Sequence, residues 1–427
     1  MAAALVIVGA SYAGVQLAAA AREQGFDAPI VLLGDETHAP YQRPPLSKGL
    51  LSGKTAVDQL ALRGPGFYTE QNIDLRLGVR ATALDLAAQR VQLADGSHLD
   101  YGWLALATGA RCRPLDVPGA TLQGVQQLRT LDDALAVQQA VSGSSRATRA
   151  CIVGGGFIGL EVAAALTAAG AQVTVVEGQT RLLARSFPQS MSDYVAAAHR
   201  QRGVALELGR GVEALLGNAA GHVESVLLDD GRLLACDLVV LGIGVLPNVE
   251  LAEAAGIACA GGILVDGCGR TSAPHVLAAG DVANMELPPV PGGPARLRLE
   301  SIQAANDGAR AAASVLAGQP QPLTAVPWFW SEQHDLKFQM AGLPAHGDET
   351  VLRGDMADDR FTLFYLRDGA VVAAHSVNRP AEHMLARKLV AVGAQIPADL
   401  LADPASDLKP FSIPGLAADP SPRSSPR

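Results

Sequence analysis

The sequence predicts an α/β protein in which two similar strand–turn–helix–strand units precede a small α+β domain. Three observations support this class. The chain has 427 residues, too many for one hydrophobic core, and its 49% hydrophobic and 18% charged residues are a normal globular balance. An apolar run enters a glycine-rich turn twice, at GASYAG (9–14) and GGGFIG (154–159). Beyond residue 326, aromatic residues and alternating strands replace that pattern.

The order of elements follows from hydrophobic periodicity and from turn residues. Each unit opens with a buried parallel strand, turns into a helix that a glycine ends, and returns as a strand. The expected strands are 4–8, 29–33, 104–110, 151–153, 172–177, 238–242, 276–279, 361–366 and 371–377, and the expected helices are 15–24, 160–169 and 380–392.

The second glycine-rich turn matches GxGxxG with Gly154, Gly156 and Gly159. The first glycine permits a tight turn, the second lets the backbone approach a pyrophosphate, and the third lets helix and strand pack closely. Glu177 follows about 20 residues on, where an acid binds ribose hydroxyls. Strand, turn, helix and acid together predict a Rossmann-type site for NAD.

The nature of this acid bears on nucleotide choice. A carboxylate at position 177 repels a 2′-phosphate, which favours NADH over NADPH. Arg181 and Arg185 lie just beyond and leave the strictness of that choice open.

The first turn departs from the pattern, because Ser11 stands between Gly9 and Gly14. A small side chain there still allows the pyrophosphate to approach. Asp35, with Glu36 beside it, is the candidate acid. The GxSxG spacing of a hydrolase nucleophile elbow is absent, so we interpret this turn as a second dinucleotide site.

Composition excludes several classes of function. The formal net charge of −9 disfavours nucleic acid and anionic membranes as partners. No apolar stretch reaches the ~20 residues that cross a bilayer, and the N-terminus has no cationic stretch typical of a signal peptide. Scattered cysteines and histidines predict neither disulfides nor a metal site, and they favour the cytoplasm. The cysteines are Cys112, Cys151, Cys236, Cys259 and Cys268.

Several longer segments carry a more specific signal than either turn. Together they resemble the putidaredoxin reductase-like branch of the pyridine nucleotide-disulfide oxidoreductase superfamily, over about residues 4–411. GGGFIGLEVA (154–163) and VNRP (377–380) agree with it. The segments are VIVGASYAG (6–14), YQRPPLSK (41–48), LATGA (106–110), VLAAGDVAN (276–284) and PWFWSEQHDLKFQMAGL (327–343).

The resemblance implies a glutathione reductase-like arrangement with a discontinuous first domain. FAD is expected in residues 1–112 and 245–325, and NADH in residues 113–244. Residues 326–412 form the C-terminal α+β domain, and residues 413–427 form a disordered tail. Neither the sequence nor the resemblance distinguishes a monomer from a homodimer.

The resemblance also places residues around the two cofactors. By similarity, FAD contacts fall on Ala13, Asp35, Lys48, Ala81, Arg129, Asp281 and Ile302, beside Gly9, Ser11, Gly14, Thr108, Gly109 and Gly280. The NAD site comprises Gly154, Gly156, Gly159, Glu177 and Gly244. Members of the family pair a lysine and a glutamate beside the flavin N5, which makes Lys48 and Glu161 the candidate catalytic residues.

The absence of redox cysteines bears on how electrons leave the flavin. Related thiol reductases carry a redox cysteine pair or a single cysteine after the second strand, but residues 35–60 contain no cysteine. The resemblance therefore implies hydride transfer from NADH to FAD, then single-electron transfer to a 2Fe-2S ferredoxin that supplies a haem or Rieske oxygenase. The alternatives are a reductase for rubredoxin, a quinone or another acceptor, and a flavin redox sensor similar to apoptosis-inducing factors.

An acidic reductase that binds an acidic ferredoxin needs a local basic face. The candidate residues for this docking face are Arg296, Arg298, Arg310, Lys337, Trp328 and Trp330.

Overall fold

The computed structural model describes residues 4–143, 147–287, 296–344 and 347–413. The chain divides into two compact units. The larger unit holds residues 1–290 and 294–324, and the C-terminal unit holds residues 325–427 together with 291–293. No helix in the described ranges is long and apolar enough to cross a membrane. The predicted disorder of residues 413–427 falls, apart from Ile413, outside the described residues.

The first sheet of the larger unit is parallel and has the order β19-β7-β1-β2-β3. Both faces are buried: Leu5 and Ile7 of β1 belong to one core cluster, and Val6 and Val8 to another. This explains why β1 reads as an unbroken apolar run. The strands are β1 (Leu5–Val8), β2 (Ile30–Leu33), β3 (Ile73–Arg76), β7 (Trp103–Leu106) and β19 (Val276–Ala278).

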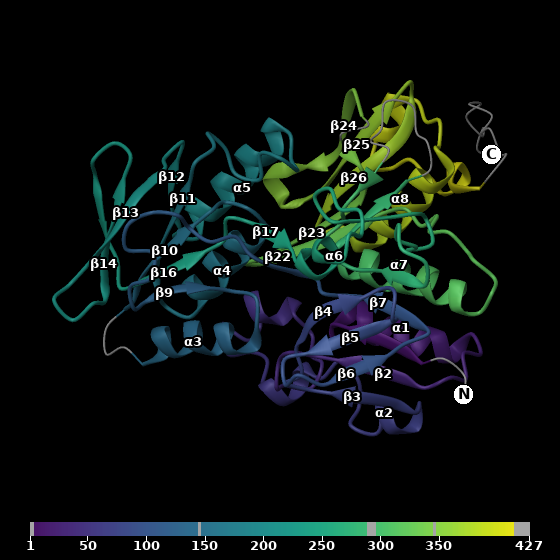
Figure 1. The fold of residues 1–427 in the computed structure, drawn as a ribbon. Coiled ribbons are helices and arrows are strands. Elements are labelled where there is room, and N and C mark those ends of the chain that lie inside the picture. Colours follow the sequence, from purple (N-terminus) through teal and green to yellow (C-terminus); the bar gives the residue numbers. More distant parts are fainter. Residues whose placement is uncertain (1–3, 144–146, 288–295, 345–346, 414–427) are drawn as a thin grey trace, which may run out of the picture. The chain divides into compact units, whose positions relative to one another are not determined.

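Two helices cover one face of this sheet side by side, α1 (Tyr12–Glu23) and α7 (Ile302–Leu316) (Figure 1). Their contact is rich in alanine, because small side chains let the helices approach closely. In this way residues almost 300 positions apart build a single core.

The second sheet has the order β12-β11-β10-β16-β9 and is also parallel. It repeats the opening of the first sheet, with α4 (Phe157–Ala168) directly after the glycine-rich turn. Both turn helices begin three residues before their predicted starts, because helix geometry sets in right after Ser11 and Gly156, before the apolar periodicity is visible. The strands are β9 (Val125–Gln127), β10 (Arg149–Val153), β11 (Gln172–Glu177), β12 (Ala205–Leu208) and β16 (Leu238–Leu241).

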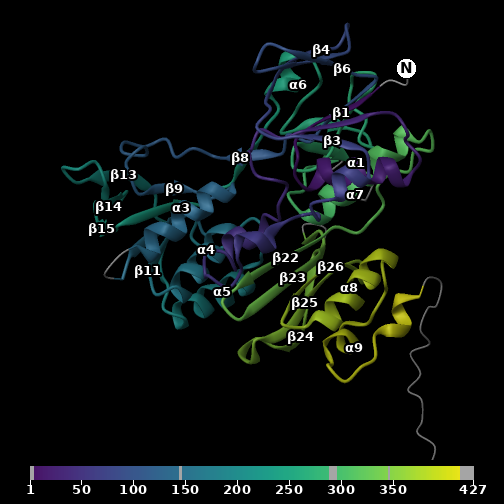
Figure 2. The same cartoon turned by 90° about the horizontal axis from the view of Figure 1, so that it is seen from below.

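The segments that link the two sheets pair with each other. The predicted strand 104–110 ends at Leu106, because Gly109 adopts a φ of 64° and turns the chain. A new strand, β8 (Ala110–Cys112), which is labelled in Figure 2, then pairs antiparallel with β17 (Val245–Pro247). The segment by which the chain leaves the first sheet is therefore adjacent to the segment by which it returns from the second sheet.

Further elements complete the larger unit. They are β4 (Ala81–Asp85), β5 (Arg90–Leu93), β6 (His98–Asp100), β13 (Val212–Gly217), β14 (Val223–Leu228), β15 (Leu233–Ala235), β18 (Ile263–Val265), β20 (Ala283–Glu286), β21 (Arg296–Leu297), α2 (Phe67–Glu70), α3 (Leu131–Ser142), α5 (Gln189–Gln201), α6 (Glu250–Ala254), η1 (Pro44–Ser47) and η2 (Val57–Leu60).

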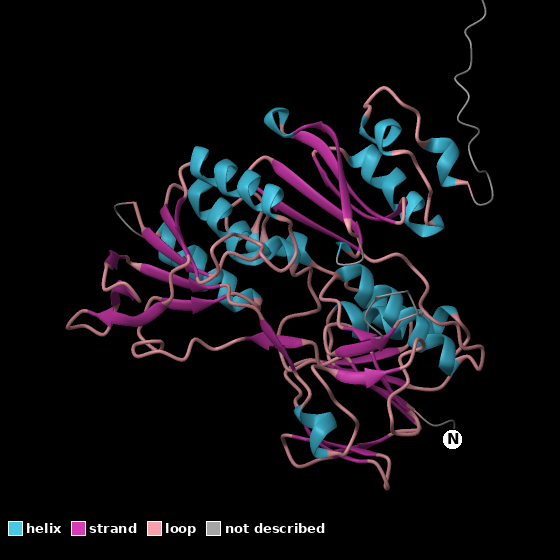
Figure 3. Cartoon of the chain, turned by 90° about the horizontal axis from the view of Figure 1, so that it is seen from above, coloured by secondary structure: helices cyan, strands magenta, loops and turns pink. Residues whose placement is uncertain are grey.

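The C-terminal unit is an antiparallel sheet of order β22-β23-β26-β25-β24 with helices on one face (Figure 3). The hairpin predicted at Asp368 and Gly369 is present, with φ values of 50° and 76° as a two-residue turn requires. The elements are β22 (Trp328–Gln333), β23 (Leu336–Gly342), β24 (Glu349–Asp355), β25 (Arg360–Arg367), β26 (Ala370–Val377), α8 (Pro380–Val392), α9 (Ala398–Ala402), η4 (Met356–Asp358) and η5 (Lys409–Ser412).

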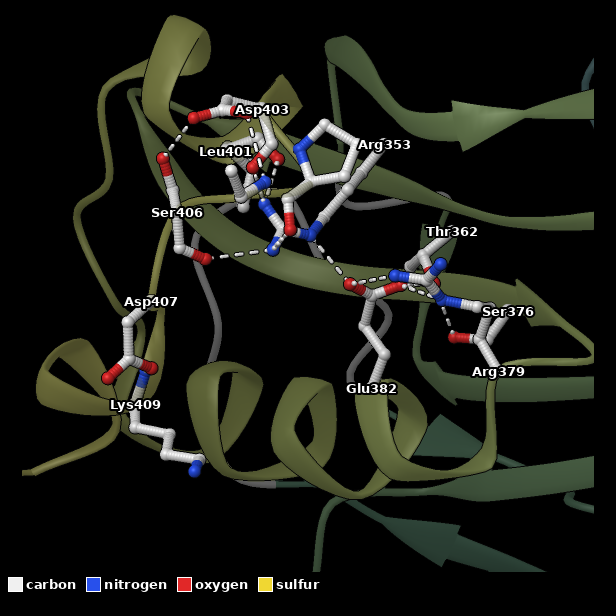
Figure 4. Close-up of polar contacts among 12 residues, drawn as sticks. Arg353, Thr362, Ser376, Arg379, Glu382, Leu401, Asp403, Ser406, Asp407 and Lys409 are labelled. Atoms are coloured by element: carbon white, nitrogen blue, oxygen red, sulfur yellow. Dashed lines mark hydrogen bonds and ion pairs between the residues drawn. The ribbon is translucent and has the colours of Figure 1, made fainter.

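A buried ion pair joins α8 to this sheet (Figure 4). Arg353 donates from Nε to Oε1 of Glu382 at 2.6 Å, and Thr362 donates to the other carboxylate oxygen at 2.7 Å. The remaining guanidinium nitrogens of Arg353 donate to carbonyl oxygens of residues 401–406. Because both charges are fully hydrogen-bonded, the pair tolerates burial and holds the C-terminal segment on the sheet.

Candidate functional site

The first glycine-rich turn is shaped by close backbone contacts. Gly9 has a φ of 116°, and a Cβ there would lie 2.1 Å from the carbonyl oxygen of Ala107. A Cβ on Gly14 would lie 1.9 Å from the carbonyl oxygen of Gly9. Gly280, after β19, packs on Ala13, since its own Cβ would lie 2.8 Å from that methyl group. These contacts bring Gly9, Ala13, Gly14 and Gly280 together at the carboxyl ends of β1 and β19.

The helices that follow the two turns lack side-chain caps. Ser11 before α1 makes no side-chain capping hydrogen bond, and Gly156 before α4 has no side chain that could make one. The helices α3 and α7, by contrast, are capped by Thr130 and Ser301. The first amides of α1 and α4 have no side-chain acceptor at the cap position, as is also true of α5 and α8, and a helix N-terminus of this kind can bind an anion such as a pyrophosphate.

Arg43 contacts the N-terminus of α1 through Ser11. Its Nε lies 3.3 Å from Ser11 Oγ and donates to it, and its other nitrogens donate to the carbonyl oxygen of Arg129 at 2.6 Å and to Glu36 at 2.6 Å. This places a guanidinium at the N-terminus of α1. Sequence reasoning missed Arg43, although its position just before Pro44-Pro45 in the distinctive YQRPPLSK segment was a usable signal.

The two candidate acids after β2 have different surroundings. Glu36 is held by Arg43 and by the hydroxyl of Tyr41, which donates to it at 2.5 Å. Asp35 is exposed and makes no hydrogen bond or ion pair with any residue that the structure describes. The structure therefore leaves Asp35 open to a ribose and gives Glu36 a structural partner.

Other predicted FAD residues converge from distant segments. Arg129 pairs with Asp281 at 2.9 Å, and its Nη2 lies 3.5 Å from where a Cβ of Gly109 would be. Thr108 donates from Oγ1 to the carbonyl oxygen of Asn248, which anchors the linking segment. Two predicted contacts lie at element starts: buried Ala81 opens β4 and half-buried Ile302 opens α7.

The second turn has the same backbone contacts as the first. Cβ atoms on Gly154 and Gly159 would lie 2.4 Å and 2.1 Å from backbone carbonyl oxygens. A Cβ on Gly156 would meet nothing within 4 Å, so the space next to this backbone is open. Gly244, with a φ of 93°, follows β16 at the same sheet edge. The residues present fit a dinucleotide pyrophosphate.

Glu177 closes this second site on one side. Its Oε2 accepts a hydrogen bond from the amide of Gly155 at 2.6 Å, and its Oε1 accepts one from the amide of Gln179 at 2.7 Å. Arg181 is committed elsewhere, since its guanidinium donates to Phe187, Ala184 and Ser192. The carboxylate is thus fixed at the end of β11 and Arg181 does not neutralise it.

The predicted catalytic residues meet in a buried ion pair. Lys48, just after η1, places Nζ 2.6 Å from Oε2 of Glu161 on α4. The side chains are 16% and 1% exposed, respectively. Lys48 follows the first dinucleotide turn in the chain and Glu161 belongs to the helix of the second, so this pair brings the two sites together.

The predicted docking residues are not free cations. Arg296 pairs with Glu286 at 3.5 Å, Arg310 with Glu23 at 3.1 Å, and Lys337 with Glu332 at 3.5 Å. Arg298 pairs with Glu300 and also donates to the carbonyl oxygen of Asp281 at 3.0 Å, so it supports the first site. In the C-terminal unit Trp328 stacks on Trp330 with ring centroids 5.6 Å apart, and Arg387 lies over Trp328.

The thiols are unsuited to redox chemistry. All five cysteines lie in described parts of the chain and are free. Burial raises the pKa of Cys236 to about 11, and burial also raises the pKa of Cys151 and Cys112. Because thiolates are the reactive form, none of these three is poised as a nucleophile.

Comparison with known proteins agrees with this geometry. Residues 3–309 match the family described as pyridine nucleotide-disulphide oxidoreductase, and residues 328–412 match the family described as reductase C-terminal. Rhodocoxin reductase of Rhodococcus erythropolis is 42% identical over 95% of this chain and 93% of its own length. The ferredoxin–NAD(+) reductase component of the anthranilate 1,2-dioxygenase system of Burkholderia cepacia is 42% identical over 95% and 98%.

Solved structures give the same result. The covalent complex of putidaredoxin reductase and putidaredoxin has a chain that superposes with a TM-score of 0.91 at 37% identity, covering 96% of this chain and 98% of that one. The predicted fold class and the predicted resemblance are both confirmed. The chain belongs to the pyridine nucleotide-disulphide oxidoreductase family.

Proposed function

We propose that this chain is an FAD-dependent NADH:ferredoxin reductase, which passes electrons one at a time to a 2Fe-2S ferredoxin that supplies an oxygenase. The relatives confirm the predicted enzyme class at the level of NAD(P)H-dependent ferredoxin reductases. The preference for NADH, the type of cluster and the docking face go beyond them and are our proposal.

One observation carries the proposal: the ion pair between Lys48 and Glu161. It connects the turn after the first dinucleotide unit to the helix that opens the second. An enzyme that transfers hydride between two bound cofactors needs their reactive ends in contact, because a displacement of about 1 Å can cost a factor of ~100 in rate. An ion pair between the two dinucleotide-binding segments of the larger unit can hold the reactive ends of the two cofactors in the required alignment.

The residues of this chain supply position and charge. When bound, FAD supplies the ability to accept a hydride and to release electrons singly. Arg43, although it also pairs with Glu36, places a guanidinium at the N-terminus of α1 beside the expected pyrophosphate position, and Asp35 holds the ribose hydroxyls. The Lys48 ammonium stabilises negative charge that develops beside it, and Glu161 keeps that ammonium in place.

The thiols argue for direct electron release. Some relatives in this superfamily pass electrons through a reactive cysteine pair, but here the five cysteines are free and burial raises the pKa of Cys112, Cys151 and Cys236. Free thiols in place of disulfides also favour a reducing compartment, so we place the protein in the cytoplasm.

The docking face remains a proposal in a modified form. Because every candidate cation pairs with an acidic side chain, none of these residues contributes an uncompensated positive charge to the surface. Arg310, 52% exposed, is the best placed to exchange Glu23 for a carboxylate of the partner. Trp328 and Trp330, in the C-terminal unit, are a separate candidate for an aromatic contact with a partner.

The decisive experiment compares acceptors under anaerobic steady-state conditions. The purified, FAD-loaded protein is supplied with NADH and, in separate reactions, with putidaredoxin, a rubredoxin, or a short-chain ubiquinone. We expect turnover with putidaredoxin to exceed turnover with the other two by at least tenfold. Faster reduction of rubredoxin or quinone would replace the ferredoxin assignment. A stable complex of reduced protein and NAD, with no rapid acceptor, would instead support a redox sensor.

A further inference from the structure

We infer that Ser47 is a positioning residue, whose hydroxyl holds Glu161 so that Lys48 stays in place for hydride transfer. This inference rests on the proposed function and names a residue that neither the sequence analysis nor the comparisons assign. It concerns the side chain immediately before Lys48 in the PPLSK turn.

The geometry shows two donors on one carboxylate oxygen. Ser47 Oγ lies 2.6 Å from Oε2 of Glu161, and Lys48 Nζ lies 2.6 Å from the same atom. Each donor also lies 3.4 Å from the carbonyl oxygen of Pro44. A hydroxyl has only one proton to donate. The carboxylate of Glu161 is closer to Ser47 Oγ than the carbonyl oxygen of Pro44 is, and a carboxylate is also the stronger acceptor. The Ser47 proton is therefore committed to Glu161.

Burial makes this hydrogen bond consequential. Ser47 is 4% exposed and Glu161 is 1% exposed, so little water is available to replace a lost donor. Glu161 is flanked by the buried apolar residues Leu160 and Val162 on α4. An ionised carboxylate in such surroundings depends on the donors that the protein provides.

The two donors differ in stiffness. The four-carbon stem of Lys48 is flexible, and its ammonium can settle wherever its partner lies. Ser47 has a short side chain on η1, a turn in which Pro44 and Pro45 restrict the backbone. Ser47 therefore fixes the carboxylate, and the carboxylate then fixes the ammonium.

The test is Ser47→Ala in the FAD-loaded protein, measured by anaerobic stopped-flow reduction of the flavin with NADH. We expect the limiting rate to fall about tenfold, equivalent to about 1.4 kcal/mol, while the NADH dissociation constant changes less than twofold and FAD stays bound. Ser52→Ala is the matched control, because the Ser52 hydroxyl in the same loop donates to the carbonyl oxygen of Gly49 and does not contact Glu161. Its rate should equal that of the unmodified protein.

A double-mutant cycle separates positioning from general loop packing. In a Glu161→Leu background the hydroxyl has no carboxylate to hold, so adding Ser47→Ala should change the rate less than twofold. An equal tenfold loss in both backgrounds, an unchanged rate in Ser47→Ala, or loss of FAD from that variant overturns the inference. None of these results touches the acceptor assignment. Failure of the unmodified protein to reduce its flavin with NADH would sink the proposed function itself.

Discussion

Nζ of Lys48 lies 2.6 Å from Oε2 of Glu161, although 113 positions separate the two residues in the chain. The glutamate is almost fully buried and the lysine is mostly buried. A charge pair in this setting is worth more to function than to stability, because desolvation offsets much of its attraction. Because the pair lies between the two dinucleotide sites, it is positioned to align the two cofactors.

Replacing Lys48 by methionine removes the ammonium and keeps the length of the side chain. We expect flavin reduction by NADH to slow by roughly ten- to a hundredfold, from the loss of about 1.5–3 kcal/mol of charge-assisted contact. FAD should stay bound. Stopped-flow absorbance measures the rate, and Lys54→Met, an exposed lysine of the same loop, is the control. Equal rates in the two variants would make Lys48 an ordinary loop cation.

Glu177 should decide between the two nicotinamide nucleotides. Its carboxylate is held by the amides of Gly155 and Gln179, so it cannot turn away from a 2′-phosphate. We expect NADH to bleach the flavin at least tenfold more efficiently than NADPH. Glu177→Ala should lower the ratio of NADH to NADPH efficiency, chiefly by weakening the binding of NADH. The control Glu224→Ala, at an exposed position, should leave the ratio unchanged. An unmodified protein that uses both nucleotides equally would contradict the assignment.

Charge reversal at Arg310 tests the docking face. Arg310→Glu faces Glu23 and would repel an acidic ferredoxin, so the Michaelis constant for putidaredoxin should rise severalfold. Reduction of ferricyanide by NADH should be unaffected. Arg90→Glu, which breaks a comparable exposed pair with Asp100, serves as the control.

Ionic strength tests the same face without mutation. Added salt above physiological strength should slow putidaredoxin reduction and spare the ferricyanide reaction, because screening weakens exposed charge pairs. A parallel loss in both reactions would place the partner elsewhere.

His383 should weaken the C-terminal unit in acid. It is 1% exposed, and neither ring nitrogen has a hydrogen-bond partner among the described residues. Burial lowers the pKa of His383 from 6.5 to about 4. Below pH 6.5 His383 is protonated in the unfolded chain but stays neutral in the folded protein until the pH approaches 4. Stability is therefore complete above pH 6.5 and falls toward pH 4, by about 1.4 kcal/mol at pH 5.5.

The variant His383→Leu removes two unsatisfied polar atoms and this titration. We expect it to stabilise the C-terminal unit by about 1–2 kcal/mol at pH 7.5, and by more at pH 5.5. Denaturation followed by tryptophan emission reports mainly on this unit, which holds Trp328 and Trp330, while Trp103 reports on the larger unit. Part of the acid loss should persist, because burial also lowers the pKa of His375 to about 3. If the variant is less stable at both pH values, the packing of the His383 ring contributes more to stability than its two unsatisfied nitrogens cost.

Much of the larger unit could be predicted from local sequence. The apolar runs became buried parallel strands, and the glycines became tight turns, because backbone conformation depends on neighbouring residues. Where the predictions were wrong, the cause was also local. The strand from residue 104 ends at Leu106 because Gly109 turns the chain, and α1 begins at Tyr12, before the apolar periodicity becomes visible.

The sequence by itself determined the two dinucleotide turns, the fold class and, through its longer motifs, the family. Only the tertiary structure decided which side chains meet. Arg43 reaches Ser11, Arg129 reaches Asp281, and Ser47 and Lys48 share one oxygen of Glu161. Such contacts depend on how distant segments close on one another, whereas a turn depends on a few adjacent residues. The structure also places an acid beside each predicted docking cation. For Arg298 and Lys337 that acid is near in sequence, whereas Glu23 reaches Arg310 only because α1 packs on α7.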